Sequence, residues 1–391
     1  MQTPVYLDYN ATTPVAEAAR ERMKPYLRER FGNPSSGGHA FGWMAEEAVE
    51  LAREEVASLL DVEEEPAEAL TFTSGATEAL NLAIKGVARA YRSKGRHLVT
   101  CQTEHKAVLG ACEALEERGW DVTYLPVGAD GCVDPARFAD ALTDETVLAT
   151  VMRANNETGV LQPVEALAET ARAADVLFLT DATQAVGKIP FHAGAVDLAV
   201  ASAHKFYGPK GAGVLYRRRR RRPRVRLEPL IHGGGQEEGL RGGTLNAPAL
   251  AGMGAAAALA EEHRDAERLG RLRDRFEEHL RGALPGVQIN GAGAERLPQT
   301  ASVTFPGVRA EHLESELRDL AVSTGSACST GTQAPSHVLK AMGLSDAEAR
   351  ATLRFSLGRP TTEEEIQFAA ERVTEAVREL RREPCNVPVA A

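Results

Sequence analysis

Residues 175–218 decide the fold of this chain, and they read DVLFLTDATQAVGKIPFHAGAVDLAVASAHKFYGPKGAGVLYRR. Three apolar runs, DVLFLT, VDLAVAS and GAGVLYRR, are bounded by glycine, proline and polar residues, which is typical of strands in a buried sheet. Asp181 directly follows the first run, and His204 and Lys205 follow the second. Ligands of open α/β sheets bind beyond the carboxyl ends of the strands, so this stretch predicts both a sheet and a site at its edge.

The same pattern continues towards the N-terminus from this stretch. Amphipathic segments of helical length alternate with short apolar runs, and such alternation predicts right-handed crossovers and a mainly parallel sheet. We expect strands near 69–73, 96–101, 121–127 and 145–153, and helices near 43–60, 76–95, 105–119 and 163–174.

The regular alternation of predicted strands and helices ends at about Ala247. Residues 250–284 predict one long helix that could link two domains, and shorter helical and strand-like segments follow it. We therefore expect a large α/β domain over residues 16–259. We expect a small α+β domain over residues 260–391, with residues 1–15 packed on it.

Composition excludes several classes of protein. The chain has 45 Lys+Arg against 55 Asp+Glu, a net charge of −10, which argues against a general DNA-binding or membrane-surface protein. The N-terminus shows no basic and apolar leader, so we expect a cytoplasmic protein. The five cysteines are odd in number and form no C-x-x-C, so we expect neither a disulfide framework nor a metal site.

An arginine run at 217–222 is the strongest local charge feature. It could bind an anionic partner, but the acidic balance of the whole chain favours a solvated turn between strands.

Polar residues follow three other predicted strand ends. Ser74, Gly75 and Thr77 lead into a helix whose N–H groups could hold a phosphate, although the same pattern is equally typical of a simple N-cap. His105 opens a helix, and two asparagines, Asn155 and Asn156, follow another strand.

Lys205 stands out among the eight lysines because it follows a buried strand. Burial lowers the pKa of a lysine, which is the condition for a Schiff-base lysine. A lysine, the carboxylate of Asp181, a histidine, an asparagine and a phosphate-type helix start at one sheet edge are together the residues that pyridoxal phosphate requires.

The chain resembles the cysteine desulfurases of the NifS/IscS-like group, within the class V aminotransferase family. The resemblance extends almost from end to end, through YLDYNATTPV, FTSGATEALNLAIKG, TEHKAVL, NNETGVLQP, DATQAVGKIP, SAHKFYGPKG, HGGGQEEGLRGGT, STGSACSTG and LRFSLGR. It implies the fold type I of pyridoxal-phosphate enzymes, with a seven-stranded, mainly parallel sheet and a small α+β C-terminal domain.

The resemblance also implies roles for individual residues. Lys205 would carry the cofactor and move protons, His105 would stack on its ring, and Cys328 would take sulfur as a persulfide. Asp181 would bond the ring nitrogen and Gln184 the ring hydroxyl, while Asn156 and Arg354 would hold the substrate carboxylate. The remaining cofactor-binding positions are Gly75, Ala76, Thr77, Ser202 and His204, together with Thr244, which would reach the phosphate of a neighbouring subunit in a homodimer.

The implied activity is conversion of L-cysteine to L-alanine, with delivery of sulfur to proteins of iron–sulfur cluster assembly or of tRNA and cofactor thiolation. A selenocysteine lyase or another class V enzyme is the same-fold alternative, although an aminotransferase has no need of Cys328. A non-catalytic sulfur relay or RNA-binding scaffold is supported only by the arginine run.

Overall fold

A computed structural model describes residues 3–63, 65–219, 225–262, 265–324 and 334–382. Its largest sheet has seven strands in the order β2-β8-β7-β6-β5-β3-β4. β7, β6, β5, β3 and β4 are parallel neighbours, and β8 runs antiparallel to both β7 and β2, so the prediction of a mainly parallel sheet is confirmed. The strands are β2 (Leu70–Thr73), β3 (His97–Cys101), β4 (Asp121–Leu125), β5 (Thr146–Thr150), β6 (Leu177–Asp181), β7 (Leu198–Ser202) and β8 (Gly213–Arg217).

Helices cover both faces of this sheet because successive residues of each strand point to opposite sides. In β3, Leu98 packs into one apolar cluster with α4 and α5, whereas Val99 packs into the other with α2, α7 and α8. The helices of this part are α1 (Glu17–Arg28), α2 (Ala40–Leu59), α3 (Pro66–Ala69), α4 (Ala76–Tyr91), α5 (Lys106–Glu116), α6 (Pro135–Ala141), α7 (Val164–Ala173) and α8 (Ala247–Glu262).

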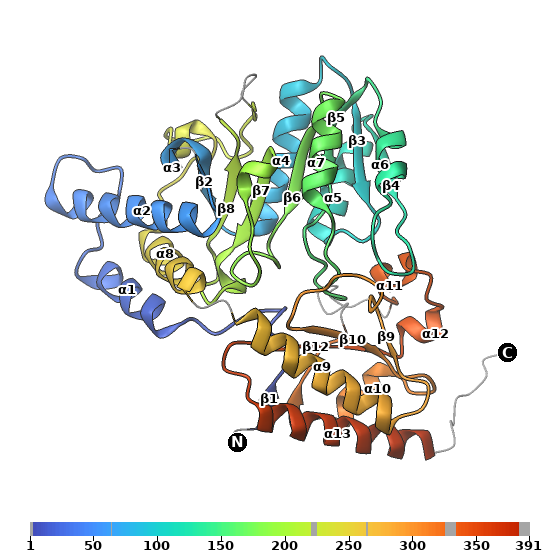
Figure 1. Cartoon of the computed structure of the whole chain (residues 1–391). Helices are drawn as coiled ribbons and strands as arrows, with labels where there is room; N and C mark the ends of the chain where they lie inside the picture. Colours follow the sequence, from blue (N-terminus) through green and yellow to red (C-terminus); the bar gives the residue numbers. More distant parts are fainter. Residues whose placement is uncertain (1–2, 64, 220–224, 263–264, 325–333, 383–391) are drawn as a thin grey trace.

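The C-terminal part forms a second layer of structure below the large sheet (Figure 1). A three-stranded antiparallel sheet, β12-β10-β9, packs on α9 and α13, and the N-terminal β1 pairs with β11 in parallel. The elements are β1 (Val5–Tyr6), α9 (Ala266–Ala283), β9 (Gln288–Ile289), β10 (Thr300–Thr304), α10 (Ala310–Glu316), β11 (Leu320–Ala321), α11 (His337–Ala341), α12 (Asp346–Ala349), β12 (Thr352–Ser356) and α13 (Glu363–Arg382).

The apolar core of this second part is separate from the core of the large sheet. Its members come from Val5 and Leu7 and then only from Leu269 onwards. We therefore propose two domains that meet between α8 and α9, with the N-terminal segment belonging to the small one.

The long helix predicted over residues 250–284 is instead two helices, α8 and α9. Apolar side chains surround α8 on almost every side because it packs between α1 and α2. In α9 the buried residues form one stripe, Leu269, Leu272, Phe276 and Leu280, against the small core. The two helices thus bury their faces in different cores, and a single straight helix could not do both. The sequence analysis also did not predict helices α1 and α6.

The prediction of a solvated turn is wrong for the first three arginines of the run at 217–222. Arg218 Nε lies 2.6 Å from Asp197 Oδ1, and both side chains are buried. Arg217 and Arg219 lie 3.0 and 3.1 Å from a carboxylate oxygen of Glu238. These arginines hold the end of β8 against neighbouring loops, whereas positions 220–222 lie outside the described residues.

Within the described ranges, the model contains no helix long and apolar enough to cross a membrane.

Candidate active site

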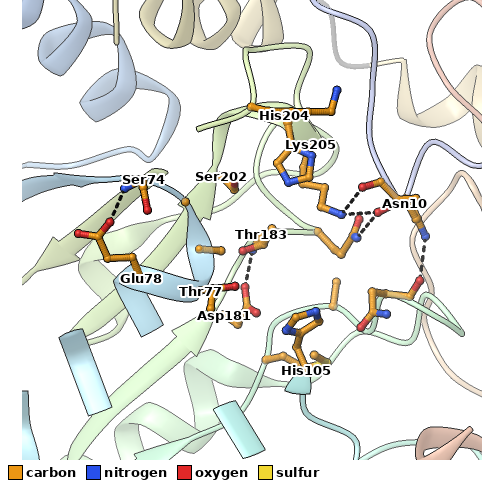
Figure 2. A pocket seen from close by; sticks show the side chains of 18 of the residues that line it. Asn10, Ser74, Thr77, Glu78, His105, Asp181, Thr183, Ser202, His204 and Lys205 are labelled. Atoms are coloured by element: carbon orange, nitrogen blue, oxygen red, sulfur yellow. Dashed lines mark hydrogen bonds between the residues drawn. The ribbon is translucent and has the colours of Figure 1, made fainter. Parts of the chain in front are cut away.

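A cavity of about 380 Å³ lies at the carboxyl ends of β5, β6 and β7, beside the start of α4 (Figure 2). It collects side chains from the N-terminal segment, the large sheet and β12, so both parts of the molecule build it. The sequence-predicted residues that line it are Gly75, Ala76, Thr77, His105, Asn156, Asp181, Gln184, Ser202, His204, Lys205 and Arg354.

Two predicted site residues are not among these lining residues. Thr244 is exposed and does not line the cavity of its own chain. Cys328 lies outside the described residues.

The start of α4 forms the side of the cavity that suits a phosphate. Gly75 precedes the helix with φ 152° and ψ 176°, a backbone conformation that residues other than glycine rarely adopt. Its turn packs against β8 so closely that a Cβ on Gly213 would lie 2.5 Å from Gly75 Cα. The following N–H groups of α4 point their positive dipole end at the cavity, which favours an anion.

His204 lines the same cavity as the start of α4. Burial, and then the charge of Lys205, lower the pKa of His204 to about 4. The imidazole is therefore neutral at physiological pH, and its Nδ1 lies 3.2 Å from Thr12 Oγ1. A neutral imidazole can donate one N–H to a phosphate oxygen.

Asp181 ends β6 with its carboxylate facing the cavity. Its side chain is buried, and Oδ1 accepts a hydrogen bond from Thr183 N at 2.9 Å. Among the residues that the model describes, Asp181 has no ion-pair partner. A buried carboxylate is costly without a cation, so this position fits a protonated pyridine nitrogen.

Lys205 follows β7 in a short 3₁₀ turn and extends into the cavity (Figure 2). Its Nζ donates to the carbonyl oxygens of Asn10 and Ala11, at 2.6 and 2.8 Å. The N-terminal segment thus holds the lysine amine inside the cavity. Tyr207, two residues further on, has φ 70° and donates its backbone N–H to Thr13 Oγ1, so the same segment also fixes the turn that carries the lysine.

His105 caps the N-terminus of α5. Its Nδ1 accepts a hydrogen bond from Ala107 N at 3.1 Å. The proton of the neutral ring is therefore on Nε2, because a nitrogen that accepts cannot carry it.

The structure separates the two adjacent asparagines by role. Asn155 is buried: its Nδ2 donates to Thr103 O, and its Oδ1 accepts from the N–H groups of Glu157 and Thr158. Asn155 therefore shapes the loop, whereas Asn156 lines the cavity.

Arg354 reaches the cavity from β12. Its Nη2 lies 2.6 Å from Asp8 Oδ1, and its Nη1 donates to Asn156 O at 2.9 Å. Its Nε is buried without a hydrogen-bond partner in the described structure. A guanidinium that is fixed in this way and retains a buried free donor is suited to a small carboxylate.

Sequence reasoning missed the buried carboxyl group of Glu104. Its Oε1 accepts from Met152 N, and burial, with a smaller contribution from Asp181, raises its pKa well above the usual range. Its side chain is fully buried, next in sequence to the cavity-lining His105. The TEH motif placed a carboxyl residue at a strand end, but only the structure shows that its side chain turns inward.

Asn10 was also missed, because it lies in an irregular segment without periodicity. Its Nδ2 donates to Thr300 Oγ1, its N–H donates to Ser356 Oγ, and its carbonyl accepts from Lys205 and from Gln184 Nε2. Lys210 is a further unpredicted lining residue. Within the described part of the chain, no three histidine, cysteine or acidic residues gather as metal ligands would.

The lysine, the buried carboxylate and the anion-binding helix start, set at the edge of this sheet, define a pyridoxal-phosphate enzyme of fold type I. The chain belongs to the aminotransferase class-V family, whose model matches residues 5–368.

Comparison with known proteins shows which members of this family the chain is similar to. The chain is 52% identical over 385 residues to "Cysteine desulfurase IscS" of Anaeromyxobacter sp. (strain Fw109-5), and the alignment covers 97% of this chain and 94% of the relative. Of solved structures, "NIFS-LIKE PROTEIN" superposes with a TM-score of 0.88 at 38% identity, over 96% of this chain and 99% of that one. "SspA in complex with cysteine" gives a TM-score of 0.79 at 39% identity, over 90% and 98% of the two chains.

Proposed function

We propose that the protein is a pyridoxal-phosphate-dependent cysteine desulfurase, which converts L-cysteine to L-alanine and takes the sulfur on Cys328. The observation that carries the proposal is that Lys205 and Arg354 line one cavity. An α-amino acid needs a basic group at its Cα–H and a cation at its carboxylate, and these two residues meet both needs from opposite parts of the fold.

The cofactor, when bound, supplies an electron-accepting ring that stabilises negative charge at the amino-acid Cα. Asp181 keeps the ring nitrogen protonated, because its buried carboxylate is stabilised by a cation. The helix start at Gly75–Thr77, with Ser202 and His204, binds the phosphate.

Substrate orientation follows from the fixed guanidinium of Arg354. Asp8 and the carbonyl of Asn156 hold it in place, so that the guanidinium would pair with the substrate carboxylate. This places the substrate Cα–H towards Lys205 Nζ, which removes the proton. His105 lines the cavity and would lie beside the cofactor, where its Nε2–H could donate to the reacting groups.

Sulfur transfer falls to Cys328. Its thiolate attacks the substrate sulfur, an S–S bond forms, and the C–S bond breaks with its electron pair going to the substrate carbon. Protonation of that carbon skeleton gives alanine, and a second thiol then collects the persulfide sulfur by exchange.

Chain length is compatible with this role for Cys328. Ser323 is fixed beside the site, because its backbone pairs with that of Arg354 in both directions. Cys328 is five residues further on, and five extended residues span at most about 17 Å. A thiol on such a tether can reach the cavity.

The proposal includes a homodimer, in which Thr244 serves the neighbouring cavity. Large apolar side chains are exposed around α1 and α2: Leu27 and Phe31 are each 67% exposed, and Trp43 is 55% exposed. Such a cluster is typical of a surface that another chain covers. Sedimentation is expected to give twice the chain mass of 41.9 kDa, and a mass of one chain would refute the dimer.

We also propose that the acceptors are sulfur-carrying proteins of iron–sulfur cluster assembly or of thiolation, in the cytoplasm. The naming of the curated relatives as IscS supports this choice.

Incubation of the holoenzyme with L-cysteine and a thiol reductant tests the proposed activity. Alanine and sulfide are expected in equal amounts, since each C–S cleavage yields one of each. Turnover of L-selenocysteine without turnover of L-cysteine would identify a selenocysteine lyase, and a keto-acid product would identify an aminotransferase.

A further inference from the structure

The turn after β6 carries a lysine whose contacts the proposed mechanism does not use. Gln184 and Lys188 are four residues apart, and backbone bonds from Val186 N to Ala182 O and from Lys188 N to Ala185 O give the turn a helical form. Side chains four residues apart then lie on one side. Lys188 Nζ donates to Gln184 Oε1 at 2.5 Å.

This contact determines which end of the Gln184 amide faces the cavity. An amide has one oxygen that accepts and one NH₂ group that donates twice. The oxygen is engaged by Lys188, and Nε2 donates one hydrogen to Asn10 O at 2.9 Å. Because Gln184 lines the main cavity, its second N–H is the group left for a ligand there.

The surroundings of Lys188 explain how its amine can serve as this donor. Among the described residues, no carboxylate lies within ion-pair distance of its Nζ. Burial, then the positive charges of Lys205 and Arg354, lower the pKa of Lys188 well below its usual range. A lysine amine donates in either protonation state, so this shift does not prevent the hydrogen bond to Gln184 Oε1.

A second cavity of about 30 Å³ separates Lys188 from the surface of the small core. The titratable side chains that line it with Lys188 are Lys205, Tyr9, Tyr207, Asp265 and Arg359. Lys205 lines both cavities, whereas Gln184 lines only the main one and Lys188 only the second.

We propose that Lys188 is a positioning residue: it fixes the amide of Gln184 so that an N–H group, and not the amide oxygen, faces the ring oxygen of the cofactor. The inference rests on the proposed function, since it requires pyridoxal phosphate in the cavity. A donor at this point stabilises the ionised form of the ring oxygen, whereas an amide oxygen would repel it.

The pH titration of the visible absorbance of the holoenzyme tests the proposal without reference to turnover. In Lys188→Met the oxygen of the Gln184 amide loses its partner and only the bond from Nε2 to Asn10 O remains, so the amide is held less firmly and donates less well to the ring oxygen. The titration midpoint is expected to rise by about one pH unit, the size expected for one hydrogen bond to an ionised group. Lys188→Arg keeps the donor and adds a fixed positive charge, so its midpoint is expected to fall.

A double-mutant cycle separates positioning from a general structural effect. Gln184→Leu is expected to raise the midpoint to a similar extent, and Lys188→Met added to it is expected to change nothing further. Lys94→Met, the same substitution at a surface lysine paired with Asp175, is the matched control and should titrate like the parent.

The possible contrary results distinguish an error in the role of Lys188 from an error in the proposed function. Additive shifts in the double mutant, or a wild-type midpoint in Lys188→Met, would overturn the role of Lys188. A parent protein that shows no visible absorbance with pyridoxal phosphate would overturn the proposed function itself. If Lys188→Met does not fold, the direction of the shift in Lys188→Arg decides, and an unchanged or raised midpoint there would refute the proposal.

Discussion

Lys205→Ala is expected to abolish covalent attachment of the cofactor and to lower alanine formation by at least about 10³-fold, because one side chain provides both the covalent link and the base. Borohydride reduction of the holoenzyme followed by peptide mass spectrometry measures the attachment. The peptide that contains Lys205 is expected to carry the cofactor in the parent and to carry none in the variant.

Lys210 provides a matched control, since it lines the same cavity five residues further along the chain. Lys210→Ala is expected to retain the cofactor on Lys205. Detection of the cofactor on Lys210 in the parent, or attachment that survives in Lys205→Ala, would contradict the assignment of Lys205.

Cys328→Ser is expected to leave covalent attachment of the cofactor intact while alanine and sulfide formation fall by at least about 10²-fold, because a serine oxygen does not replace a thiolate as the sulfur acceptor. The change in visible absorbance on addition of L-cysteine is expected to persist, since Arg354 and Lys205 still engage the substrate. Single-turnover measurement of persulfide on the protein provides the direct readout.

The other cysteines of the chain are not expected to replace Cys328 as the sulfur acceptor. Burial raises the pKa of Cys101 and of Cys112 to about 12, so neither forms a thiolate near neutral pH. Burial also raises the pKa of Cys132, which does not line the main cavity. Cys132→Ser and Cys385→Ser are therefore the controls, and both are expected to keep parental activity. Loss of activity in Cys385→Ser with retention in Cys328→Ser would reverse the assignment.

The large sheet was predictable because its strands other than the edge strand β4 are buried on both faces. Such strands read as continuous apolar runs, and their polar successors, Asp181 and Lys205, reveal the sheet edge where they meet. Arg217–Arg219 misled the same reasoning, because local charge cannot show that Asp197 and Glu238 approach from distant loops. The break between α8 and α9 was not predictable either. It arises because the first half of a continuous helical pattern packs into the core of the large sheet and the second half packs into the core of the small domain.

The contribution of the N-terminal segment was not predictable from local pattern. Asn10 is an uncharged residue in an irregular stretch, and its importance comes from partners that lie 195 to 346 residues away in the sequence: Lys205, Thr300 and Ser356. The role of Gln184 was implied by resemblance, and the motif DATQAVGKIP also contains Lys188, but only the structure shows the contact between the two side chains.

The position of this segment has a consequence for the order in which the protein is made. Residues 5–10 leave the ribosome long before residues 320–356, yet β1 pairs with β11, and the N–H of Asn10 bonds to Ser356. The contacts with the greatest sequence separation therefore close last, after the large sheet has had most of the time of synthesis in which to fold. Asn10 acquires its Ser356 contact, and the cavity acquires Arg354, only in a nearly finished chain, so a truncated polypeptide lacks a complete site.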